Sequence, residues 1–201
     1  MGLGRGMLWA AAGMALGLTT VGAQAQSFMQ NGGRTTQPVG HYEFCQSSPA
    51  ECAQVTPRQA PTELTRSLWA RIVEVNNLVN TMVVPRTDLE IWGVEERWSY
   101  PTDGVGDCED YVLEKRRLLM KAGMPAGNLL ITVVRQPNGD GHAVLTARTS
   151  LGDFVLDNLE PRVLAWQDTP YEFLKQQSER HSGVWVSIED DRQMLVGSVK
   201  K

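Results

Sequence analysis

Three residues of the chain have the types and surroundings that thiol catalysis needs. Cys108 lies within the run GDCEDY at residues 106–111, where it is expected to begin a helix. Backbone N–H groups and the positive end of the helix dipole stabilise a thiolate at such a position. A reactive cysteine also needs a base and a group that orients the base, and His142 and Asp157 are the candidates for these roles.

A predicted β-hairpin brings His142 and Asp157 together. Extended segments flank a turn at residues 149–152. A four-residue turn pairs Arg148 with Asp153, which puts His142 and Asp157 on one face as diagonal neighbours. Any turn with an even number of residues preserves this relation, whereas an odd number breaks it. The hairpin therefore predicts an imidazole and a carboxylate side by side.

These three side chains define a hydrolytic mechanism if they meet in the fold. Cys108 would attack a carbonyl carbon, and its own N–H would help to stabilise the oxyanion. His142 would accept the thiol proton and return it to the leaving amine, while Asp157 would hold the imidazole in one tautomer. The alternative is structural: a small buried cysteine, a hydrogen-bonded strand histidine and a turn aspartate.

A long helix is expected before the nucleophile. It begins at Thr62 and ends before Pro85, and its apolar residues recur at three- and four-residue steps. These apolar residues form a stripe that belongs in the core. Asparagines near its end, Asn76 and Asn80 among them, either hold a neighbouring loop or face solvent.

A second helix is expected to carry the nucleophile. It starts at Cys108, with Asp107 as the N-cap and Asp110 in a capping-box-like position. Gly123 marks its end. Lys115 is the one polar interruption of its buried face, which makes Cys108 the first residue of an otherwise apolar stripe.

The remaining chain is expected to be extended or irregular, with one further helix. Residues 26–40 are predicted to be a flexible N-terminus of the mature protein, and residues 40–61 an irregular loop. Residues 171–177 predict a last helix. The expected strands cover residues 129–134, 142–148, 153–157 and 184–188. This order predicts an α+β fold for a single domain over residues 41–201.

Residues 1–25 have the features of a secretory signal peptide. Arg5 precedes an apolar run at residues 7–18, and small residues stand at Ala23 and Ala25. The run is shorter than the roughly 20 residues that a membrane-spanning helix needs, which favours cleavage after Ala25 over an uncleaved anchor. The mature protein is therefore expected in the periplasm or outside the cell, without stable insertion in a membrane.

Charge and length limit the classes of partner. The chain has 201 residues, a formal net charge of −4 and no run of five or more basic residues. Nucleic acid and anionic membrane surfaces are therefore not expected as partners. The length that remains after cleavage suits one domain with a single core.

The three cysteines divide into a pair and a single residue. Cys45 and Cys52 are close in sequence, and Pro49 favours a turn between them. An oxidising compartment favours a disulfide over two free thiols there. Cys108 is left over, either buried and inert or kept for chemistry. His41, just before the pair, is interpreted as a surface or turn histidine.

Two tryptophans lie on the segment that leads to Cys108. Trp92 and Trp98 fall in a loop-like stretch between Pro85 and Gly106. They either wall a substrate-binding cleft or cap the hydrophobic core.

Three ordered motifs resemble one known family. GDCEDY at 106–111, GHAVL at 141–145 and LDNL at 156–159 resemble the signatures of the bacterial transglutaminase-like cysteine peptidases, which include LapG-type periplasmic proteases. The resemblance begins near residue 40 and covers most of the mature chain. It implies a papain- and transglutaminase-like core, in which the nucleophile begins a helix packed on an antiparallel sheet.

The resemblance also implies a triad and a calcium site. The residues that match the triad are Cys108, His142 and Asp157. Acidic residues that flank the cysteine bind calcium in LapG-type members, and the matching positions here are Asp107, Glu109 and Asp110. Clustered carboxylates suit Ca²⁺, although three cannot complete its shell of six to eight oxygens and the aspartates are also ordinary capping residues.

The predicted function is that of an exported cysteine endopeptidase. It would hydrolyse a peptide bond in an envelope or surface protein, such as an adhesin, and the resemblance implies a regulatory inner-membrane partner. Two alternatives stay open. The same triad serves a transglutaminase or amidase that transfers the acyl group to an amine. A calcium-dependent binding module would use Trp92, Trp98 and the acidic cluster without catalysis.

Overall fold

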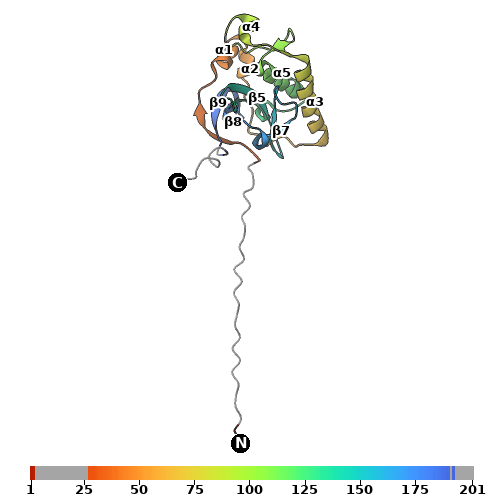
Figure 1. Ribbon diagram of the computed structural model, residues 1–201, viewed down its shortest axis with the longest axis vertical. Helices are drawn as coiled ribbons and strands as arrows, with labels where there is room; N and C mark the ends of the chain where they lie inside the picture. Colours follow the sequence, from red (N-terminus) through yellow and green to blue (C-terminus); the bar gives the residue numbers. More distant parts are fainter. Residues whose placement is uncertain (3–26, 191, 193–201) are drawn as a thin grey trace.

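The computed structural model describes residues 1–2, 27–190 and 192 of the chain (Figure 1). The predicted signal peptide, with its cleavage site after Ala25, lies outside these residues except for its first two positions. Within the described ranges, no helix is both long enough and apolar enough to cross a membrane.

A seven-stranded antiparallel sheet forms the centre of the fold. Its spatial order is β1-β9-β8-β4-β5-β6-β7. The strands are β1 (Gln30–Thr35), β4 (Leu129–Arg135), β5 (Gly141–Thr149), β6 (Gly152–Leu156), β7 (Leu164–Ala165), β8 (Glu172–Ser178) and β9 (His181–Glu189). A separate parallel pair joins β2 (Val84–Pro85) to β3 (Val105–Gly106).

Helices cover one face of this sheet. Helix α5 packs on β4 and β5, and α3 packs on α5, so the two helices lie side by side in Figure 1. The helices are α1 (Val39–Ser47), α2 (Pro49–Cys52), α3 (Arg66–Met82), α4 (Asp88–Trp92) and α5 (Cys108–Lys121), with short 3-10 turns at Ala126–Asn128 and Trp166–Asp168. The predicted α+β class is confirmed.

Apolar side chains fill both faces of the sheet. Ala143 and Leu145 of β5 belong to the large cluster that contains Ile72 of α3 and lies under the helices. Val144, between them in sequence, belongs to a second cluster with Phe173 of β8. This alternation follows from the two-residue period of a strand. It makes β5 a buried central strand and therefore a rigid support for His142.

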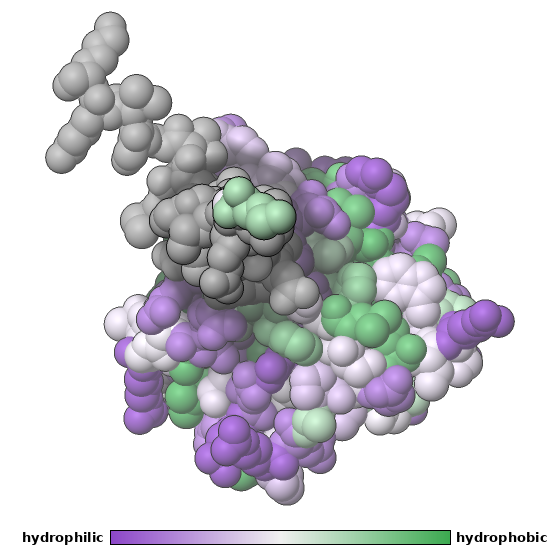
Figure 2. Space-filling view, turned by 90° about the horizontal axis from the view of Figure 1, so that it is seen from below, coloured by the Kyte–Doolittle hydropathy of each residue, from purple (hydrophilic) through white to green (hydrophobic). Residues whose placement is uncertain are grey.

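The hairpin of β5 and β6 has the predicted register. Arg148 pairs with Asp153, and Leu145 pairs with Leu156. The turn therefore has an even number of residues, and His142 and Asp157 share a face. Ser27 lies beside this turn, because the Asp153 N–H donates to the carbonyl of Ser27 over 2.9 Å. Figure 2 shows the molecule from below, where hydrophobic and hydrophilic residues are mixed over the face in view.

Three segments differ from their predicted structure. Residues 40–61, expected to be irregular, contain α1 and α2. The predicted helix at 171–177 is wrong, because residues 172–178 form β8. Its helix-forming Glu, Leu, Lys and Gln residues are outweighed by sheet pairing on both sides of the strand. Residues 30–35, within the stretch expected to be flexible, form the edge strand β1.

Candidate active site

Cys108 is the first residue of α5, as the sequence predicts. The parallel pair of β2 and β3 ends at Gly106 and delivers the chain directly to this helix. Cys108 is half-buried, and it is the cysteine outside the disulfide. Its Sγ donates to Oε2 of Glu109 over 3.0 Å, and the amide of Ala143 hydrogen-bonds the sulfur. Because Ala143 directly follows His142, this contact joins Cys108 to the strand that carries His142.

His142 and Asp157 form a buried pair at the end of the hairpin. Nε2 of His142 lies 2.8 Å from Oδ1 of Asp157, and their residues are 5 % and 2 % exposed. The carboxylate also accepts from the Leu159 N–H over 3.0 Å and from the Tyr171 hydroxyl over 2.5 Å. Asn80 of α3 donates to the Asp157 carbonyl over 2.8 Å. Of the two alternatives for the asparagines, contact with a neighbouring loop is therefore the one that Asn80 adopts.

The hydrogen bonds at Asp157 decide which nitrogen of His142 can exchange a proton. Burial alone would raise the pKa of Asp157, but the bonds from His142, Leu159 and Tyr171 hold it below its ordinary value. An ionised carboxylate can only accept, so Nε2 of His142 carries the hydrogen. Nδ1 is then the basic nitrogen of the neutral ring.

The surroundings of Cys108 favour the thiol over the thiolate. Burial raises the pKa of Cys108 well above its ordinary value, and the neighbouring charge of Glu109 adds to this. The first N–H groups of α5 have no partner inside the helix and favour negative charge there. Burial and the Glu109 carboxylate therefore disfavour the thiolate, and the start of α5 favours it.

An acidic cluster lies beside the nucleophile. Carboxylate oxygens of Asp88, Asp107 and Glu109 lie within 4.8 Å of one another. Burial raises the pKa of each, and the charge of Asp107 helps to raise that of Glu109 to about 9. Asp88 is 1 % exposed and is the first residue of α4. It lies outside the 106–111 motif, so the motif alone does not predict its place in the cluster. Nothing in its local sequence marks it out.

The donor set of this cluster fits a hard divalent cation. Oδ1 of Asp88 and Oδ1 of Asp107 are buried without a hydrogen-bond partner among the described residues. The other oxygens are tied in place, since Asp107 Oδ2 accepts from the Asp88 N–H over 3.2 Å and Asp88 Oδ2 accepts from the Arg97 N–H. Oxygen-only ligands of this kind suit Ca²⁺ or Mg²⁺ rather than zinc.

Asp107 and Asp110 do not serve as the helix caps that the sequence predicts. Asp107 occupies the N-cap position, but its side chain makes no capping hydrogen bond. Asp110 accepts from the Ser99 N–H over 2.8 Å and so ties the preceding loop to α5. A Cβ atom at Gly106 would lie 2.7 Å from Oδ2 of Asp110, which explains the glycine of the motif. Asp110 lies outside the cluster of Asp88, Asp107 and Glu109.

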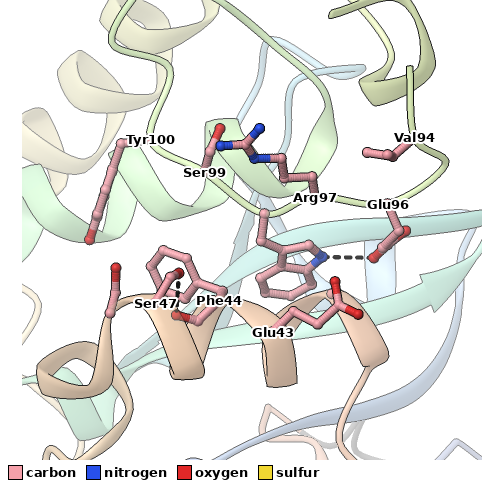
Figure 3. Close-up of a pocket in the computed structure, with 11 residues that line it drawn as sticks. Glu43, Phe44, Ser47, Val94, Glu96, Arg97, Ser99 and Tyr100 are labelled. Atoms are coloured by element: carbon pink, nitrogen blue, oxygen red, sulfur yellow. Dashed lines mark hydrogen bonds between the residues drawn. The ribbon is translucent and has the colours of Figure 1, made fainter. Parts of the chain in front are cut away.

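Trp98 and Trp92 have different environments. Trp98 is 6 % exposed and donates from Nε1 to Glu96 over 2.7 Å. It lines a cavity of about 490 Å³ between α1 and the loop at residues 94–100. Figure 3 shows Glu43 and Phe44 of α1 on one side and Arg97 and Tyr100 of the loop on the other. Trp92 is 41 % exposed and stacks under the Arg97 guanidinium, 4.0 Å away.

The cysteine pair forms the predicted disulfide, and His41 beside it is not a surface residue. Cys45 and Cys52 are bonded, which joins α1 to α2. His41 is 1 % exposed and packs edge-on against Trp98 and Trp185, at 5.1 and 5.3 Å between ring centroids. The prediction of an exposed histidine is wrong because residues 39–47 fold into a helix that packs on the core.

The family described as bacterial transglutaminase-like cysteine proteinase (BTLCP) matches residues 31–193. The chain belongs to this family. Its members are cysteine peptidases, so the protein is a transglutaminase-like cysteine peptidase. No curated protein matches the chain.

Solved structures of a LapG protease share the fold of this family member. Legionella pneumophila LapG is 26 % identical, with a TM-score of 0.51 over 63 % of this chain and 73 % of that one. Its EGTA-treated form is 25 % identical, with a TM-score of 0.51 over 63 % and 74 %. A calcium-bound form is 21 % identical, with a TM-score of 0.52 over 77 % and 84 %.

Proposed function

We propose that this transglutaminase-like peptidase is an exported endopeptidase that cleaves an envelope or surface protein through Cys108, His142 and Asp157. The observation that carries the proposal is the buried 2.8 Å contact between His142 and Asp157. The residue after His142, Ala143, hydrogen-bonds the Cys108 sulfur through its amide. A free thiol, a base and an orienting carboxylate are the parts that acyl-enzyme chemistry needs.

Each side chain has one task in the proposed reaction. Nδ1 of His142 takes the thiol proton, and the Cys108 thiolate attacks the carbonyl carbon of the scissile amide. The N–H of Cys108 helps to hold the oxyanion. His142 then protonates the leaving amine, and it later takes a proton from the water that hydrolyses the thioester. Asp157 stabilises the imidazolium that forms in both steps.

Calcium is the proposed resident ion of the acidic cluster. Asp88, Asp107 and Glu109 would hold it, and Asp88 takes the place that the sequence motif gave to Asp110. When bound, the ion would supply positive charge that offsets the carboxylates beside Cys108 and so lowers the free energy of forming the thiolate. The proposal rests on the two buried, unpartnered aspartate oxygens of the described structure and on the oxygen-only donor set.

The proposed location is the periplasm or the exterior of the cell, after removal of residues 1–25. The bonded Cys45–Cys52 pair supports an oxidising compartment. Surface adhesins are the proposed class of substrate, and an inner-membrane protein that withholds or releases the enzyme is the proposed regulator. Trp98 and the cavity beside it are the proposed wall of the substrate-binding region.

The purified protein tests the reaction directly. Wild-type protein and Cys108→Ala are incubated with an envelope-protein extract in the presence of calcium, and the products are separated and sequenced. We expect new fragments with wild type and none with Cys108→Ala. Fragments that persist with Cys108→Ala would contradict the proposed nucleophile.

A further inference from the structure

Tyr171 contacts two of the three proposed catalytic residues. It directly precedes β8 and is 7 % exposed. Its hydroxyl donates to Oδ2 of Asp157 over 2.5 Å. Its ring lies 5.6 Å from the His142 ring, at an interplanar angle of 59°. The side chain therefore packs against the base and hydrogen-bonds the group that orients the base.

The two oxygens of Asp157 have different partners. Oδ1 accepts from His142 and from the Leu159 N–H. Oδ2 accepts from Tyr171. A carboxylate with one tied oxygen can still rotate about its Cβ–Cγ bond, because that torsion is broad. A second tied oxygen fixes the plane of the group, so the direction in which Oδ1 meets His142 is also fixed.

We propose that Tyr171 is a positioning residue of the active site, which fixes the plane of the Asp157 carboxylate and thereby holds His142 in the tautomer with hydrogen on Nε2. The inference deepens the proposed function and rests on it. Tyr171 touches no reacting atom, so its effect passes through Asp157 and His142. Arg192 supports it from the backbone side, with a 2.6 Å hydrogen bond to the Tyr171 carbonyl.

The surroundings of Tyr171 keep its hydroxyl a donor. Burial raises its pKa, and its hydrogen bond to Asp157 and the charges of Asp157 and Glu160 add to this effect. The charged or titratable groups that face it are His142, Asp157 and Glu160, with Arg192 at its carbonyl. A cavity of about 200 Å³ lined by Tyr171 and Asp157 lies beside the pair. Without the hydroxyl, water can reach Oδ2 through this space.

Tyr171→Phe isolates the hydrogen bond, because it keeps the ring that packs on His142. Tyr42→Phe is the matched control, since Tyr42 is 55 % exposed on α1. The chain has three histidines, so ¹⁵N-histidine labelling gives three imidazole patterns, and His142→Gln assigns one of them. The rate of Cys108 alkylation by iodoacetamide gives a second readout that needs no substrate. All samples contain calcium, and circular dichroism verifies folding.

We expect wild type and Tyr42→Phe to show His142 with hydrogen on Nε2 and equal alkylation rates. Tyr171→Phe should show a mixture of tautomers and a rate about tenfold lower. An unchanged tautomer and rate in folded Tyr171→Phe would overturn the role of Tyr171. Neither readout depends on peptide-bond cleavage. If wild type leaves envelope proteins intact, the proposed function fails while the tautomer result still decides the role of Tyr171.

Discussion

Nε2 of His142 lies 2.8 Å from Oδ1 of Asp157, with both residues almost fully buried. The pair stands at the open end of a hairpin whose register puts the two side chains on one face. His142 lies on β5, a central strand whose next two residues, Ala143 and Val144, pack into the cores on opposite sides of the sheet. The sheet therefore holds the base of the proposed active site in a rigid setting.

Asp157→Asn should remove activity while leaving the fold intact. An asparagine amide matches the carboxylate in shape but permits the wrong His142 tautomer. We expect the rate of substrate cleavage to fall about 10² to 10⁴-fold. Asp168→Asn, an acidic residue in the 3-10 turn at Trp166–Asp168, is the control. An Asp157→Asn enzyme with wild-type turnover would show that Asp157 does not orient the base.

Calcium should stabilise the folded protein by binding Asp88 as well as Asp107 and Glu109. A ligand that binds only the folded state adds about 2.7 kcal/mol at a hundred times its Kd. Thermal unfolding is measured with calcium and with EGTA for wild type, Asp88→Asn and the exposed control Asp103→Asn. The calcium-dependent rise in Tm should be lost in Asp88→Asn and kept in Asp103→Asn. Equal rises in all three would remove Asp88 from the site.

Lys115 should make stability depend on alkaline pH. It is 0 % exposed, and its Nζ has no hydrogen-bond partner among the described residues. Burial lowers its pKa from 10.5 to about 7, against the opposing charge of Asp157. Between these values the unfolded chain binds a proton that the folded chain lacks, so the free energy of unfolding rises with pH in that window.

Lys115→Met tests this dependence because it keeps the side-chain length and removes the charge. At pH 6 the variant should be more stable than wild type by about 1 kcal/mol or more. The difference should shrink as pH rises from 7 to 10, as measured by urea unfolding. Lys121→Met, exposed on the same helix, is the control. A parallel pH dependence in Lys115→Met and wild type would show that Lys115 does not titrate in this window.

Loss of the disulfide should lower stability without adding a second active thiol. The Cys45–Cys52 bond closes a short loop, and such a loop contributes about 2 to 3 kcal/mol in the chain-entropy model. Cys45→Ser combined with Cys52→Ser should therefore unfold at lower urea concentration. Thiol titration should count one reactive group in the native protein and in the double variant. Unchanged stability would mean that packing of α1 and α2 alone holds this region.

The choice between hydrolysis and acyl transfer is open to a competition experiment. The acyl-enzyme formed on Cys108 accepts either water or an amine. A labelled primary amine is added to the cleavage reaction with the envelope extract. We expect hydrolysis products to dominate, with little label in protein. Label incorporation that exceeds hydrolysis would assign a transglutaminase reaction instead.

The contact between His142 and Asp157 was accessible from sequence because it is local. His142 and Asp157 belong to one hairpin, and a turn with an even number of residues fixes their shared face. The place of Cys108 at the start of a helix was accessible because residue types typical of a helix start follow a loop there, although Asp107 makes no capping hydrogen bond. Each of these inferences needs only a short window of sequence and the periods of a helix and a strand.

Asp88 and Tyr171 could not be predicted in the same way. Asp88 comes close to Asp107 and Glu109 because β2 pairs with β3, a parallel contact between short segments without a sequence signature. Tyr171 precedes a strand whose buried side chains include Gln176 and Gln177, so the usual apolar alternation is absent. The composition of that segment favours a helix, and the sheet overrides it. Both residues depend on tertiary contacts that local patterns do not encode.

The most direct test of the central claim compares cells that carry the wild-type chain with cells that carry Cys108→Ala. Protein N-termini in the envelope and secreted fractions are labelled, enriched and identified by mass spectrometry. The account predicts at least one internal N-terminus of an envelope or surface protein that is present with wild type and absent with Cys108→Ala. Identical sets of N-termini in the two strains, with both proteins exported and folded, would contradict it.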